Sequence, residues 1–192
     1  MKLSKTLIYL FLAPVVTGAQ EIPVDTSNPR IQVVTNLGSF VIELDQDRAP
    51  YTVDNILQYV NEGHYEGTVF HRVILGFIAQ AGGLTEDFEL KPVQRSVVNE
   101  SGNGLSNMRA TVGLARANDP HSGNAQFYIN LADNLDLNPR PTRWGYTVFG
   151  TVVEGMEVVD EIGHRPTGAM GQFERNVPVD TVVIERVEEL AE

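Results

Sequence analysis

Short segments of alternating polarity place the tightest constraint on how this chain folds. Residues 31–35 and 39–44 form two such segments, separated by a short turn that ends in Gly38. Alternation in the second segment puts three apolar side chains on one face: Phe40, Ile42 and Leu44. Similar short strands are expected within residues 69–80, 111–115, 126–131, 147–153 and 177–187. A succession of short strands predicts a β-barrel or a sandwich.

Two helices are expected among these strands. Val53, Ile56, Leu57 and Val60 follow the spacing of an amphipathic helix that starts near Pro50 and ends at Gly63. A second, shorter helix is expected from three apolar residues that precede a terminating glycine: Met156, Val159 and Ile162 before Gly163. The helices therefore cap a mainly β domain, and residues 84–110 form a long polar loop, of a kind that is usually functional or packed on itself.

The composition fits one folded domain and excludes several classes of function. The chain has 192 residues, of which 42% are hydrophobic, so it can bury a core. Its formal net charge of −11 argues against a nucleic-acid partner. The sequence contains no cysteine, which excludes a disulfide framework, thiolate zinc ligands, a thiol nucleophile and a thioether-linked lipid anchor.

The first segment has the features of a cleavable signal peptide. Lys2 and Lys5 precede an apolar run at 7–16, and small residues at 17–19 suit cleavage after Ala19. The run is about half the roughly 20 residues that a transmembrane anchor needs. A buried N-terminal helix is the alternative. We therefore divide the chain into a signal peptide (1–19), an N-terminal arm (20–30) and one domain (31–192).

Simple motif searches identify no metal or nucleophile chemistry. The four histidines lack metal-ligand spacing and are expected to be structural or exposed: His64, His71, His121 and His164. The chain has no G-x-S-x-G elbow and no phosphate-binding loop, and its many carboxylates carry no glycosidase pattern. A hydrolase with a Ser/His/Asp triad assembled in space stays open as an alternative.

An arginine within an apolar strand is the most informative feature of the sequence. Arg72 lies in the segment 70–83, where a guanidinium is costly unless it is paired or lines a cleft. Farther along, strand alternation places Gln126 and Tyr128 on one face and Phe127 and Ile129 on the other. From the residues alone, a buried salt bridge beside an aromatic core explains this pattern as well as a binding site does.

The sequence of this segment, FHRVILGFIAQAGG, resembles the signature of the cyclophilins, the peptidyl-prolyl cis-trans isomerases. Three further blocks resemble cyclophilin blocks in the same order: residues 113–117, 125–130 and 146–150. Asn99-Glu100 and Asn103-Gly104-Leu105 are similar to the bacterial branch. The resemblance covers residues 31–187, and four ordered blocks make it specific.

This resemblance implies a fold and an activity. The family fold is a closed eight-stranded antiparallel β-barrel capped by two α-helices, with the substrate groove on its outer surface. The implied reaction is rotation about an Xaa-Pro peptide bond, which breaks no covalent bond and needs neither a cofactor nor a metal. The implied partners are proline-containing peptides and folding proteins. A monomer without a membrane anchor is expected.

The resemblance also assigns residues to the site. Arg72 matches the catalytic arginine, whose planar and permanently charged guanidinium suits the stabilisation of a twisted amide better than lysine does. The matching substrate-binding residues are Phe77, Ile78, Gln80, Ala115, Arg116, Gln126, Tyr128, Leu137 and Tyr146.

Several positions depart from the family pattern. Ile78 replaces a methionine and Tyr128 a phenylalanine, and both keep the bulk of the pocket. Asp136 lies where many eukaryotic members carry a tryptophan that binds cyclosporin, and Trp144 is in a different register. We therefore expect weak cyclosporin binding.

The interpretation of the whole sequence is an exported prolyl isomerase that assists the folding of other exported proteins. The periplasm is the expected location, or secretion where the cell has no outer membrane. A module that binds proline segments without catalysis is the main alternative.

Overall fold

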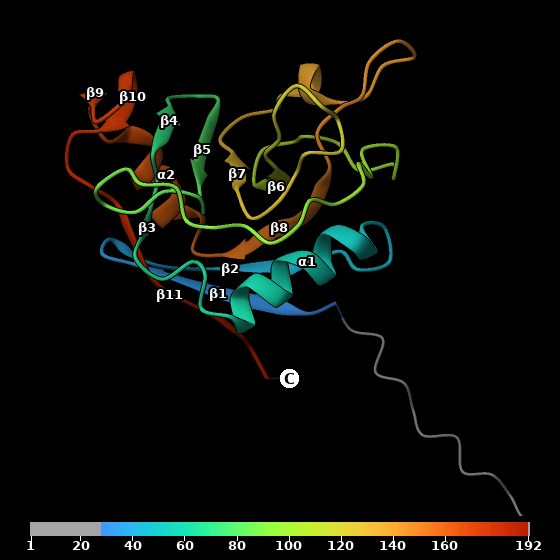
Figure 1. Ribbon diagram of the computed structural model, residues 1–192, viewed down its shortest axis with the longest axis horizontal. Coiled ribbons are helices and arrows are strands. Elements are labelled where there is room, and N and C mark those ends of the chain that lie inside the picture. The colour runs from blue at the N-terminus through green and yellow to red at the C-terminus, as the bar shows by residue number, and fades with distance from the viewer. Residues whose placement is uncertain (1–27, 192) are drawn as a thin grey trace, which may run out of the picture.

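The protein is described here by a computed structural model, in which residues 28–191 are placed (Figure 1). The expected signal peptide and residues 20–27 of the expected arm lie outside the described residues. No helix between residues 28 and 191 is long and apolar enough to cross a membrane. The first strand begins at Arg30.

A nine-stranded, curled antiparallel sheet forms most of the molecule (Figure 1). The strand order across the sheet is β3-β11-β1-β2-β8-β6-β7-β5-β4. The strands are β1 (Arg30–Thr35), β2 (Gly38–Leu44), β3 (Thr68–Val69), β4 (Arg72–Ile74), β5 (Ile78–Ala81), β6 (Thr111–Leu114), β7 (Phe127–Asn130), β8 (Val148–Glu154) and β11 (Val183–Glu189). The expected mainly β fold is confirmed.

The expected closed eight-stranded barrel is not observed, because the sheet is open. Its two end strands, β3 and β4, are separated by Phe70 and His71 alone, yet no ladder joins them. The backbone N–H of Phe70 instead donates to the carbonyl of Val182 at 2.9 Å. The chain therefore leaves one edge of the sheet and enters the other within two residues.

Both expected helices are present. The helix α1 (Pro50–Asn61) has proline at its first position, and no side chain of its N-cap residue bonds to the helix. The carboxylate of Glu100 accepts hydrogen bonds from the backbone N–H groups of Tyr51 and Thr52 instead, at 3.2 and 2.9 Å. The long loop after β5 thus caps α1 from outside the helix. The second helix, α2 (Met156–His164), begins after Gly155.

The expected single strand at 177–187 is wrong, because the chain turns between two strands there. The strand β10 (Phe173–Pro178) pairs with β9 (Thr167–Met170) in a separate two-stranded sheet. Proline at the end of β10 cannot donate to a further ladder. This hairpin packs against β4 and covers that side of the curled sheet.

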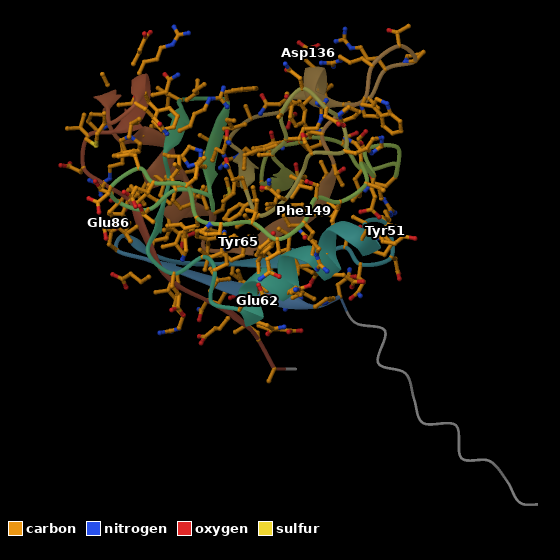
Figure 2. All side chains as sticks on the ribbon, in the orientation of Figure 1. Tyr51, Glu62, Tyr65, Glu86, Asp136 and Phe149 are labelled. Carbon is orange, nitrogen blue, oxygen red and sulfur yellow. The ribbon has the colours of Figure 1, made fainter. Side chains whose placement is uncertain are left out.

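One hydrophobic core fills the inside of the sheet and extends to both helices. Val53 and Ile56 of α1 and Val159 and Ile162 of α2 belong to the same cluster as the strand residues. Tyr65 and Phe149 are among its largest fully buried side chains and lie inside the molecule in Figure 2. The core is closed to substrate, so a binding site has to lie on the outer face.

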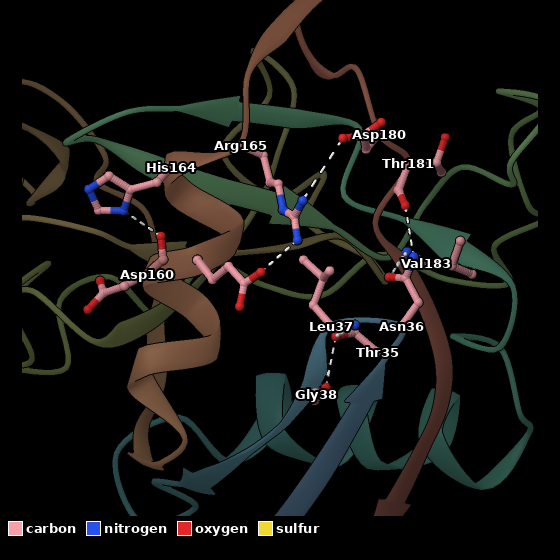
Figure 3. A network of polar contacts seen from close by, with 11 residues as sticks. Thr35, Asn36, Leu37, Gly38, Asp160, His164, Arg165, Asp180, Thr181 and Val183 are labelled. Carbon is pink, nitrogen blue, oxygen red and sulfur yellow. Dashed lines mark hydrogen bonds and ion pairs between the residues drawn. The ribbon is translucent and has the colours of Figure 1, made fainter.

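The turn between β1 and β2 is fastened to one later segment of the chain, residues 181–183 (Figure 3). Asn36 donates from Nδ2 to the carbonyl of Thr181 at 3.0 Å and accepts the N–H of Val183 at 3.1 Å. Nearby, Arg165 at the end of α2 pairs with Glu161 at 2.6 Å and with Asp180 at 3.9 Å. We call the three charged residues the ion-pair cluster.

Candidate active site

Cross-strand pairing brings the candidate site residues into one row on the outer face of the sheet. Arg72 of β4 lies opposite Gln80 of β5, and Gln80 lies opposite Tyr128 of β7. Tyr128 in turn lies opposite Gly113 of β6. Side chains directly opposite one another share a face, so residues from four strands meet although they are far apart in sequence.

Alternation along β7 separates this site from the core as expected. Phe127 and Ile129 belong to the core cluster, whereas Tyr128 lies among the residues of an outer pocket. Gly113 makes room for the tyrosine, because a Cβ atom at that position would lie 2.2 Å from Tyr128 Cζ. The sequence of β6 therefore admits an aromatic ring next to it.

The pocket has a volume of about 160 Å³ and takes its lining from strands, a 3-10 turn and three connecting segments. Nine of the ten residues expected at the site line it: Arg72, Phe77, Ile78, Gln80, Ala115, Arg116, Tyr128, Leu137 and Tyr146. The tenth, Gln126, is not among the lining residues. Its side chain is partly exposed and accepts a hydrogen bond from Gln80 Nε2 at 3.1 Å, so it lies next to a lining residue.

Arg72 is half-buried and has a neutral partner. Its Nη1 donates to Oε1 of Gln80 at 3.2 Å. None of the ion pairs formed among residues 28–191 involves Arg72. Burial lowers the pKa of Arg72, partly offset by Tyr146, but a guanidinium stays charged in proteins. The alternative of a buried salt bridge is therefore wrong for this residue.

The apolar side of the pocket comes from four separate pieces of chain. Phe77 follows the β4–β5 turn, where Gly76 has a φ of 68°. Leu137 ends the 3-10 turn η1 (Leu135–Leu137), and its carbonyl accepts the backbone N–H of Tyr146 at 2.9 Å. The rings of Tyr128 and Tyr146 meet edge to face, with centroids 6.0 Å apart. These groups form a small cup next to the guanidinium.

Arg116 forms part of the pocket wall, because its guanidinium already donates hydrogen bonds to backbone carbonyls of the protein. It lies 4.5 Å from the centre of the Tyr146 ring. Its nitrogens donate to three backbone carbonyls, those of Gly145, Trp144 and Ala117, at 3.3, 3.1 and 2.9 Å. A cation stacked on an aromatic ring and bonded in this way is held in one orientation.

Four asparagines beneath the pocket were not expected from the sequence. Asn107, Asn130, Asn134 and Asn138 are joined by side-chain hydrogen bonds, and we call them the amide network. Each looks like an ordinary turn or strand-end residue in the sequence. No local pattern signals that they meet.

The two positions relevant to cyclosporin binding, Asp136 and Trp144, both lie outside the lining of the pocket. The side chain of Asp136 is 93% exposed and projects from η1 at the outer end of the molecule (Figure 2). Trp144 is half exposed, and its ring packs against His121 with centroids 5.3 Å apart. Neither residue is among those that line the pocket.

The histidines do not form a site. His71 lies buried beside Arg72, where burial lowers its pKa to about 4. His64 is also buried, and burial lowers its pKa as well. Within the described part of the chain, no group of three or more His, Cys, Asp or Glu side chains is arranged to hold a metal ion.

A half-buried arginine with a neutral partner lies beside a small apolar cup on a curled β-sheet, an arrangement suited to a ligand with a small apolar group next to a hydrogen-bond acceptor. The profile of the family described as cyclophilin type peptidyl-prolyl cis-trans isomerase/CLD matches residues 30–189. The chain belongs to this family and is a cyclophilin-type peptidyl-prolyl cis-trans isomerase.

Bacterial relatives support the same assignment. A peptidyl-prolyl cis-trans isomerase of Streptomyces antibioticus is 49% identical over 158 residues, which are 81% of this chain and 95% of that protein. Peptidyl-prolyl cis-trans isomerase B of Escherichia coli is 46% identical over 156 residues, covering 80% of this chain and 94% of the relative.

Solved structures agree on the fold. A cyclophilin type peptidyl-prolyl cis-trans isomerase of Cryptosporidium parvum superposes with a TM-score of 0.70 at 23% identity, over 86% of this chain and 99% of that one. A second structure of that protein, obtained in the presence of the dipeptide Ala-Pro, gives a TM-score of 0.69 at 24% identity.

Proposed function

We propose that this isomerase acts on proline-containing segments of exported proteins, with Arg72 as its catalytic residue. The observation that carries the role of Arg72 is its setting: a half-buried guanidinium bonded to a neutral amide at the rim of an apolar cup. The cup has room for one small ring, which suits the pyrrolidine of proline. Solved structures of the family include one obtained in the presence of Ala-Pro, the minimal Xaa-Pro unit.

The mechanism follows from the electronic structure of the amide. Resonance gives the C–N bond its partial double-bond character and a rotation barrier of about 18–20 kcal/mol. In the half-rotated state the prolyl nitrogen regains its lone pair and becomes a hydrogen-bond acceptor. The Arg72 guanidinium donates to that nitrogen, while the cup holds the ring. Only an interaction that is stronger in the twisted state than in the planar one accelerates rotation.

Gln80 and Gln126 position the guanidinium. The chain of bonds from Arg72 to Gln80 and on to Gln126 fixes both amides without adding a charge. Gly83 leaves space for Gln126, because a Cβ atom there would lie 2.4 Å from its side chain. A carboxylate in place of Gln80 would pair with Arg72 and hold it away from the substrate.

The role of Arg72 is tested with a protease-coupled or NMR exchange assay on an Xaa-Pro peptide. We expect Arg72→Ala to lower kcat by about 10²- to 10³-fold, the usual loss for one transition-state donor. Arg72→Lys, which keeps the charge but not the planar fork, serves as the matched variant and should stay well below the wild type. Equal kcat in the wild type and Arg72→Ala, with unchanged far-UV circular dichroism, would contradict the assignment.

Export is the second part of the proposal, and it is supported by the basic start, apolar run and small residues of segment 1–19. We propose the periplasm as the site of action, or secretion in a cell without an outer membrane. N-terminal sequencing of the protein recovered from the cell envelope should begin at Gln20. An intact Met1 on protein recovered from the cytoplasm would contradict export.

Weak cyclosporin binding stays a prediction. The exposed carboxylate of Asp136 offers no indole to the ligand, and Trp144 packs against His121. We expect a higher inhibitory concentration than for a cyclophilin that carries the tryptophan, measured in the same isomerisation assay. Asp136→Trp should lower that concentration.

A further inference from the structure

Asn107 lies 1% exposed beneath the pocket, in the loop between β5 and β6. Its Oδ1 accepts hydrogen bonds from the Tyr128 hydroxyl at 2.7 Å and from Asn130 Nδ2 at 3.2 Å. Its Nδ2 donates to Asn138 Oδ1 at 3.0 Å and to the Tyr146 carbonyl at 3.5 Å. A carboxamide has two acceptor positions and two donor hydrogens. Every hydrogen-bonding position of this side chain is therefore used.

The backbone of Asn107 extends the same connections. Its N–H donates to Asn138 Oδ1 at 2.8 Å, and its carbonyl accepts the N–H of Asn134 at 2.7 Å. Asn134 in turn donates from Nδ2 to the carbonyl of Phe77 at 2.8 Å. Asn138 directly follows Leu137 in the chain. Asn107 is thus linked, directly or through one residue, to Phe77, Tyr128, Leu137 and Tyr146.

We propose that Asn107 is a positioning residue that sets the width of the proline cup by fixing these apolar walls relative to one another. The inference rests on the proposed role of the cup in binding the prolyl ring. The walls come from four separate stretches of chain, and their mutual contacts include the two tyrosine rings and one backbone hydrogen bond. Asn107 bonds directly to Tyr128 and Tyr146. It reaches Phe77 through Asn134 and Leu137 through Asn138, so one residue fixes the spacing of the four walls.

The tyrosine at position 128 is part of this arrangement. Burial raises the pKa of the Tyr128 phenol well above its ordinary value, so the hydroxyl stays protonated and acts as the donor to Asn107. A phenylalanine would keep the ring but leave Oδ1 of Asn107 with Asn130 as its one partner. The hydroxyl therefore fixes the depth of the ring in the cup.

The kind of kinetic change separates positioning from catalysis. The cup holds the prolyl ring in both the planar and the twisted state, so a looser cup weakens both equally. Loss of such uniform binding raises KM and leaves kcat unchanged. Arg72 acts on the twisted state, so its loss lowers kcat instead. A merely structural role for Asn107 would lower the melting temperature and change neither parameter.

The experiment compares three single variants of the full chain. Asn107→Asp is isosteric but cannot donate to Asn138 or to the Tyr146 carbonyl. Tyr128→Phe removes one hydroxyl. The control is Asn103→Asp, which makes the same change in the same loop at a residue bonded to Leu105 N–H and the Val148 carbonyl, neither of which lines the pocket.

We measure kcat and KM for an Ala-Pro peptide, its Kd by NMR titration, and the melting temperature of each variant. We expect KM and Kd to rise about tenfold in Asn107→Asp and about threefold in Tyr128→Phe, as for lost buried hydrogen bonds. The value of kcat should stay within about twofold of the wild type, and the control should keep wild-type KM and Kd. The double variant Asn107→Asp/Tyr128→Phe should be less affected than the product of the single effects, because the two changes remove different bonds of one side chain and loosen the same walls of the cup.

The outcomes separate this inference from the proposed function. Wild-type KM and Kd in Asn107→Asp and Tyr128→Phe, in an active enzyme, would overturn the positioning role and leave the isomerase intact. Lack of acceleration by the wild type would overturn the catalytic proposal, while the Kd values would still test Asn107. If Asn107→Asp does not fold, Tyr128→Phe decides: a raised KM supports the inference and an unchanged KM refutes it.

Discussion

Two polar networks in this protein tie together segments that are far apart in sequence, and they do so with opposite kinds of groups. The amide network beneath the pocket is neutral, and Asn107 and Asn130 are fully buried within it. The ion-pair cluster at the end of α2 is charged (Figure 3), and its Arg165 side chain is 26% exposed. The side chains of Glu161 and Asp180 are 53% and 80% exposed.

The difference follows from the cost of burial. Neutral amides can be buried without loss when each donor and acceptor has a partner, and they then stay in one arrangement. Charged groups at the surface keep their hydration, but their attraction is weakened by water and salt. The protein therefore has buried amides where the walls of the pocket have to keep fixed positions. It has surface ion pairs where two segments need only lie close to each other.

Gly113→Ala should have the largest effect, because it acts directly on the amide network. The new methyl group would meet the ring of Tyr128, displace it and break its bond to Asn107. We expect a loss of about 3 to 5 kcal/mol in the free energy of unfolding, from overpacking and an unsatisfied buried amide. Chemical denaturation measures this loss. Gly168→Ala in β9 is the control, since its nearest neighbour would be 3.7 Å away. Equal losses in both would remove the special role of this row of residues.

His71 tests whether the buried region at the start of β4, where its ring packs against Phe173, tolerates a positive charge. Burial lowers its folded-state pKa to about 4 from the ordinary 6.5. The unfolded chain therefore binds the proton more readily, and stability is fully present above pH 6.5 and falls as the pH drops towards 4. The contribution of this residue is at most about 3 kcal/mol. We expect His71→Gln to flatten the pH dependence of the unfolding free energy between pH 7 and 4. An identical pH profile in the variant would contradict this.

Glu100 is intermediate between the amide network and the ion-pair cluster, because it is charged but accepts hydrogen bonds from backbone N–H groups. Glu100→Gln removes the charge at the start of α1 and one of the two carboxylate acceptors. We expect a loss of about 1 to 2 kcal/mol, the usual worth of a helix cap. Glu62→Gln, at the other end of α1, is the matched control, and it should cause no loss because a negative charge near a helix C-terminus is unfavourable. Thermal unfolding of both variants measures the difference.

Arg165 should show the smallest effect. Arg165→Met removes both contacts of the ion-pair cluster but keeps much of the side-chain volume. We expect a change within about 1 kcal/mol that shrinks further in 1 M salt, together with wild-type kcat and KM. A loss above 2 kcal/mol that salt does not reduce would show that the cluster acts like the amide network, and the contrast between the two would fail.

Local patterns in the sequence predicted the elements of the fold well. The helix α1 follows from the spacing of its apolar residues and from Pro50, and the two faces of β7 follow from alternation. The open sheet did not follow, because whether β3 pairs with β4 depends on register across the whole sheet. The β9–β10 hairpin was missed because most of its residues are exposed or partly exposed and show no clear alternation.

The candidate site was predicted through resemblance, and its supporting residues were not. Eight of the nine lining residues lie in the quoted sequence blocks, and Leu137 was assigned by its match to the family pattern outside them. Gln126, also expected in the lining, is bonded to the lining residue Gln80 and lies next to it. The amide network joins residues 107 to 138 through tertiary contacts, and an asparagine in a loop gives no sign of a partner 21 or 31 positions away.

The two end strands of the sheet have a consequence for how the enzyme meets extended polypeptides. An uncovered edge strand has unpaired backbone groups, so another chain can add to the sheet there, which leads to aggregation. Here β3 has two residues and β4 has three, and the β9–β10 hairpin packs against β4. An unfolded chain thus finds little backbone to pair with at either margin. It can bind at the proline cup and dissociate again without adding a strand to the sheet of the enzyme.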